Sequence, residues 1–158
     1  MKKFLTAFVS AIIILSLAIF LYNEFLRHMQ PNEELINIIY ETAIANTEIN
    51  FDTVITSFLW EKLFIISPFS IPSQLFKTYE IVPQNINTNI EIFDGIALLV
   101  FVYNNYVVGF VDYPYRKGNF INRIIPNESH YKAFYRHSTL FTTEIKSNNI
   151  YFRHIKIS

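Results

Sequence analysis

The chain opens on an uncharged apolar run from Phe4 to Tyr22, which follows the basic pair Lys2 and Lys3. As a helix this run is roughly 28 Å long, close to the hydrocarbon thickness of a bilayer, and it is apolar on every face. The pattern predicts a transmembrane anchor over residues 1–24. By the positive-inside rule the N-terminus is expected in the cytoplasm of a single-pass protein of the bacterial inner membrane.

Two other interpretations of this run stay open. Ser16 and Ala18 provide the small residues of a signal-peptide cleavage site, although cleavage there leaves an apolar new N-terminus. A buried helix of a soluble domain is the third interpretation, but such a helix normally shows an apolar stripe rather than apolarity on all sides.

Helical periodicity returns after the apolar run. Leu35, Ile38, Ile39 and Ala43 recur at helical spacing, so an amphipathic helix is predicted over residues 31–46. Pro72 precedes a second, shorter helix, which is predicted over residues 73–79.

Strand patterns fill most of the remaining chain. Asn104 and Asn105 separate two apolar runs and predict a tight hairpin, because Asn tolerates positive φ. The predicted strands are 58–66, 96–103, 106–113, 120–125, 138–145 and 150–157, while 127–137 fits a helix or a strand. The predicted fold class is therefore α+β. We expect an extracytoplasmic domain over 25–158 in which the two helices pack on a mainly antiparallel sheet of about five strands.

Composition excludes several classes of site. The chain has no Cys, which rules out disulfides, thiolate catalysis and Cys-ligated zinc. Its three glycines are not clustered, which argues against phosphate-binding loops of the Walker or Rossmann type. No cofactor is predicted.

Charge is distributed unevenly although the net charge is zero. Between residues 30 and 111 acidic residues outnumber basic ones nine to two, whereas from 112 onward basic residues outnumber acidic ones eight to three. The simplest interpretation is that the two parts neutralise each other on folding. The functional interpretation is an anion-binding surface of interleaved aromatic and basic residues. Its candidate residues are Tyr113, Tyr115, Arg116, Lys117, Lys132 and Arg136.

A short motif adds a resemblance. The run from Phe58 through Trp60, Glu61 and Lys62, followed by Pro68 and Phe69, resembles an F-x-W-D-K stretch and a Pro-Tyr pair in small membrane-anchored bacterial proteins of uncharacterised function. The resemblance covers about a dozen residues and departs from the motif at Glu61 and Phe69. It implies a single-span extracytoplasmic α+β protein and supplies no activity.

Three sets of residues have the side-chain types of a catalytic or metal site, and each also fits an ordinary surface role. His130, His137 and His154 have zinc-ligand chemistry but no tight ligand spacing. The residue types of a hydrolase triad are present in Ser129 and His130 with Asp112 or Glu128. The sequence motif of a nucleophile elbow is absent. Paired carboxylates, Glu61 with Asp94 or Asp112, are equally unspecific. No catalytic or metal residue is predicted.

The sequence therefore favours a membrane-tethered accessory or binding protein of the bacterial envelope that is not an enzyme. The lipid bilayer is the expected partner, and the expected ligand is an anionic lipid, an envelope polymer or another membrane protein. Binding of nucleic acid is not expected. The alternatives are a small envelope hydrolase and a regulatory or immunity subunit of a membrane complex.

Overall fold

The computed structural model describes residues 2–27, 30–82, 85–120, 130–147 and 149–155. Within these ranges four α-helices accompany two antiparallel sheets, so the α+β class agrees with the sequence prediction. The helices are α1 (Lys2–Arg27), α2 (Glu34–Ala45), α3 (Phe51–Val54) and α4 (Pro72–Thr78). The strands are β1 (Glu48–Asn50), β2 (Lys62–Ile66), β3 (Ile96–Tyr103), β4 (Tyr106–Pro114), β5 (Tyr131–Tyr135), β6 (Leu140–Lys146) and β7 (Asn149–His154).

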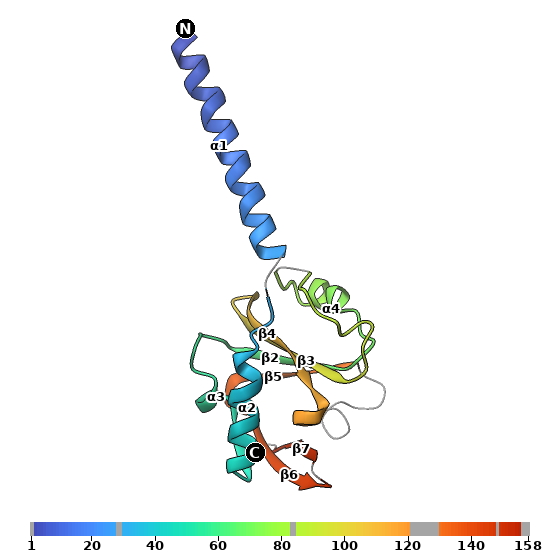
Figure 1. The fold of residues 1–158 in the computed structure, drawn as a ribbon. Coiled ribbons are helices and arrows are strands. Elements are labelled where there is room, and N and C mark those ends of the chain that lie inside the picture. Colours follow the sequence, from blue (N-terminus) through green and yellow to red (C-terminus); the bar gives the residue numbers. More distant parts are fainter. Residues whose placement is uncertain (1, 28–29, 83–84, 121–129, 148, 156–158) are drawn as a thin grey trace.

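The predicted transmembrane anchor is contradicted. A membrane span needs about 20 consecutive apolar residues, and no helix in the described part of the chain is long and apolar enough to cross a membrane. The prediction rests on the whole run from Phe4 to Tyr22 as one spanning segment. The predicted single-pass localisation in the inner membrane depends on that segment, so it is contradicted as well. Helix α1 extends away from both sheets in Figure 1.

The single sheet of about five strands is also wrong, because the strands divide into two sheets. The first has the order β1-β6-β7 and the second the order β4-β3-β2-β5, with antiparallel pairing throughout. The β3–β4 hairpin turns at Asn104 and Asn105, whose φ angles of 49° and 64° match the predicted tight turn. The ambiguous stretch before residue 137 contains strand β5. Most of the predicted strand 120–125 lies outside the described residues.

Apolar side chains cover both faces of the four-stranded sheet, as its nearly continuous apolar central strands require. One face, together with α2 and the three-stranded sheet, forms a first core that includes Trp60, Phe101 and Phe141. The opposite face forms a second core with α4 and the segment that follows it, and this core includes Phe64, Phe76 and Ile90. Figure 1 shows α4 on the opposite side of the sheet from α2.

Aromatic rings fill much of the first core. Phe120 stacks on Phe152 with ring centroids 4.0 Å apart, and Tyr113 meets both rings edge-on. Such contacts add about 1 kcal/mol each beyond the burial of apolar area. Trp60, which needs a partner for its indole N–H, donates to the carbonyl oxygen of Ile55 at 3.1 Å.

Candidate functional site

The predicted anion-binding residues lie at opposite edges of the four-stranded sheet. Tyr113 belongs to the edge strand β4, and Tyr115, Arg116 and Lys117 follow it in a short 3-10 helix. The other two, Lys132 and Arg136, lie on and directly after β5, which forms the opposite edge. The structure therefore does not bring the six residues together into one patch.

Several of these groups are already used inside the fold. Tyr113 is fully buried, and its hydroxyl donates to the Lys117 carbonyl at 3.0 Å. Burial raises the pKa of the Tyr113 phenol, and its neighbour Tyr40 raises it further. The ammonium of Lys117 donates to Asn37 Oδ1 at 2.9 Å and lies 4.9 Å from the Tyr40 ring centroid. Burial also raises the pKa of Tyr115, with a contribution from Asp94.

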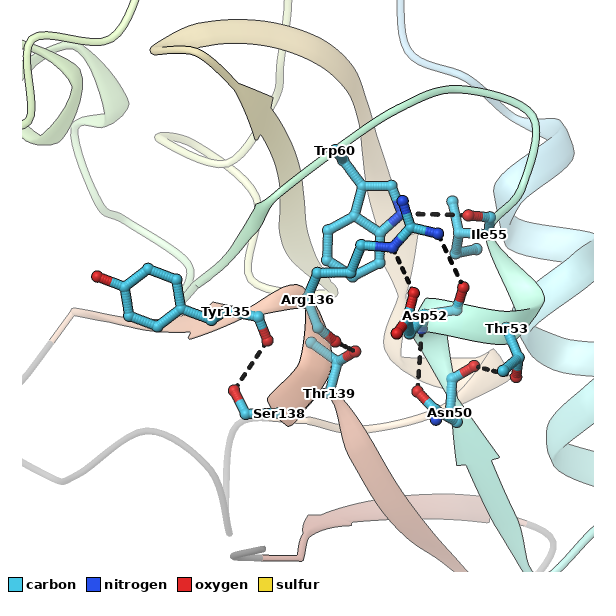
Figure 2. A network of polar contacts seen from close by, with 9 residues as sticks. All are labelled: Asn50, Asp52, Thr53, Ile55, Trp60, Tyr135, Arg136, Ser138 and Thr139. Atoms are coloured by element: carbon cyan, nitrogen blue, oxygen red, sulfur yellow. Dashed lines mark hydrogen bonds and ion pairs between the residues drawn. The ribbon is translucent and has the colours of Figure 1, made fainter.

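Arg136 is the centre of a network that joins distant parts of the chain (Figure 2). Its Nε donates to a carboxylate oxygen of Asp52, and its Nη2 donates to the Asp52 backbone carbonyl at 3.1 Å. The guanidinium carbon also lies 5.3 Å from the Trp60 ring centroid. Paired with a carboxylate and stacked on an indole, Arg136 connects α3 to the end of β5 and serves as a structural residue.

The histidines do not converge either. His130 precedes β5, His137 stacks on the Tyr135 ring, and His154 Nε2 lies 2.7 Å from the Ser138 carbonyl oxygen. In the ranges that the structure describes, no three metal-ligating side chains form a group that could hold an ion.

The candidate triad is not assembled in the described residues. Asp112 lies on the edge strand β4, across the sheet from His130, and its carboxylate accepts hydrogen bonds from Thr88 Oγ1 and the Asn89 backbone N–H. Ser129 and Glu128, the other residues of that set, lie outside the described residues. Of the carboxylates, Glu61 lies beside Val102 near the end of β3, whereas Asp94 precedes the start of the same strand.

A pocket that the sequence did not reveal lies between α4 and the start of β5. We call it the α4 pocket; its volume is about 320 Å³, within the range of small-ligand sites. Apolar side chains form much of its wall, and its polar groups come from both elements. It is lined by Ile66, Phe69, Ser70, Ile71, Gln74, Leu75, Thr78, His130 and Tyr131.

The rim of the α4 pocket is built by the turn Ser67–Ser70. The buried Ser70 hydroxyl donates to the Ser67 carbonyl at 2.6 Å, and Ser67 Oγ donates to the His130 carbonyl at 2.9 Å. The Phe69 N–H donates to the Ile90 carbonyl at 2.7 Å. These bonds fix the turn to the start of β5 and to the segment that covers the second core.

Phe69 adopts a conformation that normally belongs to glycine. Its φ is 59°, in the left-handed region, and its side chain is 63% exposed at the pocket rim. A Cβ in that region costs about 1–2 kcal/mol, and an exposed ring recovers little of this by burial. Strain of this kind in a native structure points to function.

Exposed apolar side chains gather on the same part of the chain. Outside α1, most of the exposed large apolar residues in the described chain fall between residues 69 and 106, in the segments on either side of α4 and at the facing ends of β3 and β4; they are Phe69, Ile71, Tyr79, Val82, Ile92, Phe93, Tyr103 and Tyr106. The sequence offered one signal for this site. Pro68 suits the second position of a turn whose third position often needs positive φ, and Phe69 occupies that third position.

Comparison with protein families, with curated proteins and with solved structures finds no match for this chain.

Proposed function

We propose that this chain is a non-enzymatic binding or accessory protein whose binding site is the α4 pocket. The observation that carries the proposal is Phe69, an aromatic residue with positive φ and 63% exposure at the rim of a preformed cavity. The strained backbone of Phe69 and its exposed ring both lie at this pocket, and this coincidence supports a binding role for it.

A hydrolase, the alternative from sequence, has less support. Catalysis needs an acid, a base and a donor that converge on one reacting atom. In the described residues, the candidate base His130 lines the α4 pocket, but the candidate acid Asp112 lies on the opposite edge strand and is engaged by Thr88 and Asn89.

A simple apolar probe tests the proposed function. Toluene is titrated into the isotope-labelled full chain, and binding is followed by site-resolved NMR at Leu75, Thr78 and Tyr131, which line the α4 pocket. We expect saturable shifts at these three residues. Phe69→Ala should weaken binding at least threefold, because the probe loses a wall of the pocket.

The matched control is Leu59→Ala. Leu59 is exposed to a similar degree, 67%, but does not line the pocket. This variant should bind toluene like the unmodified chain. An absence of saturable shifts at the pocket, or equal effects of the two substitutions, contradicts the proposed function.

A further inference from the structure

The α4 pocket has no Lys, Arg, Asp or Glu among its nine lining residues, and His130 is the one basic side chain in the lining. A charged group that enters such a site finds no Lys, Arg, Asp or Glu side chain to offset the hydration that it loses. The lining therefore favours an uncharged ligand.

Some polar side chains of the pocket form hydrogen bonds within the protein, and others do not. Ser70 and Thr78 use their hydroxyls within the protein, donating to the carbonyls of Ser67 and Gln74 at 2.6 and 2.9 Å. By contrast, the Gln74 side-chain amide and the His130 ring form no hydrogen bond with any other residue that the structure describes, and both residues are exposed. These two groups, which come from different elements, are available to a ligand.

The unengaged amide indicates what kind of polar group fits. A Gln side chain carries one carbonyl acceptor and an NH₂ donor, so it pairs with the N–H and C=O of a peptide group. The apolar walls, Ile66, Ile71 and Leu75, accommodate a large apolar side chain beside that peptide group. The Phe69 ring at the rim favours an aromatic guest, because aromatic pairs attract each other in edge-on or offset geometry.

We propose that the α4 pocket binds one aromatic side chain of an uncharged peptide segment, whose backbone amide is held by the side chain of Gln74. This inference rests on the proposed function, since it names the ligand class of the same site. A pocket of about 320 Å³ holds one such side chain, so neighbouring residues of the peptide lie outside it.

The test uses N-acetyl amino-acid amides as single-residue peptide probes on the full chain, with binding read by NMR at the pocket residues. N-acetyl-phenylalaninamide should bind at least tenfold more tightly than the corresponding lysine and glutamate amides. Gln74→Ala should weaken the phenylalanine probe about tenfold and toluene much less, because toluene has no peptide group and loses only a contact with the pocket wall.

The matched control is Lys77→Ala, an exposed position on the same helix that does not line the pocket. It should leave both probes unaffected. If the phenylalanine and charged amides bind equally, or if Gln74→Ala weakens both probes alike, the peptide inference fails while toluene binding still supports the proposed function. If toluene also fails to bind, both proposals are overturned.

Discussion

Replacing Phe69 by Gly and by Ala separates the strain of the backbone from the role of the ring. Both variants lose the same ring, which is 63% exposed and so contributes little burial. Ala keeps a Cβ in the left-handed region, at φ 59°, whereas Gly adopts this region freely. Glycine relieves about 1–2 kcal/mol of backbone strain in the folded state. This gain in stability is partly offset by about 0.4–1 kcal/mol, because glycine gives the unfolded chain more conformational entropy to lose on folding.

We therefore expect Phe69→Gly to be more stable than Phe69→Ala by about 1 kcal/mol, while both variants bind toluene at the α4 pocket more weakly than the unmodified chain. The assay is urea unfolding followed by the fluorescence of Trp60, the single tryptophan, which is 2% exposed. In thermal unfolding the same difference corresponds to about 4 °C. Equal stability of the two variants, or a less stable Gly variant, would refute the claim that Phe69 is strained.

Three further predictions concern the stability of the fold. A double-mutant cycle of Asp52→Asn and Arg136→Gln should give a coupling energy of about 1 kcal/mol in urea unfolding, since the pair is only partly buried; additive single effects would show that the pair does not interact. Gly118→Ala should cost about 3 kcal/mol, because φ is 155° and a Cβ would lie 2.3 Å from the Phe152 ring; Gly95→Ala, whose Cβ meets only the half-exposed Phe93 ring, is the control and should cost much less. Because burial raises the pKa of Tyr113, the stability that this group contributes is present below about pH 10 and is lost above it, at up to about 1.4 kcal/mol per pH unit. Tyr113→Phe should flatten this alkaline loss in urea titrations at pH 9 to 11, and an unchanged slope would contradict the assignment.

Local patterns predicted the local elements well. The spacing of Leu35, Ile39 and Ala43 places all three in the first core on one face of α2. Asn104 and Asn105 set a tight turn because their side chains tolerate positive φ, and this preference is readable from two residues. A buried Trp needs a partner for its indole N–H, and the carbonyl of Ile55 is that partner for Trp60.

The division into two sheets depends on contacts that no local pattern encodes. Strand β1 has three residues, and it pairs with β6, whose Thr142 lies opposite Glu48 although the two are far apart in sequence. The strand predicted over residues 58–66 begins only at Lys62, and Trp60, which precedes it, lies in the first core.

The predicted anion-binding residues do not form one patch, and the α4 pocket was not predicted, because both outcomes depend on contacts between distant parts of the chain. A basic residue in sequence gives no sign of a distant acidic partner, so Arg136 was assigned to a surface although Asp52 engages it. In contrast, the α4 pocket is made of residues that are unremarkable one by one, and its features arise from the positive φ of Phe69 and from the nearness of α4 to His130. Neither feature has a counterpart in composition or periodicity.

The central claim, that the α4 pocket is a binding site with Phe69 at its rim, is tested most directly by contacts between a bound probe and the pocket wall. In an isotope-filtered NOE experiment on the full chain with N-acetyl-phenylalaninamide, the account predicts NOEs from the ring protons of the probe to the methyl groups of Ile66 and Leu75, which line the pocket. NOEs only to other apolar surfaces, such as Leu59 or Ile145, would contradict it.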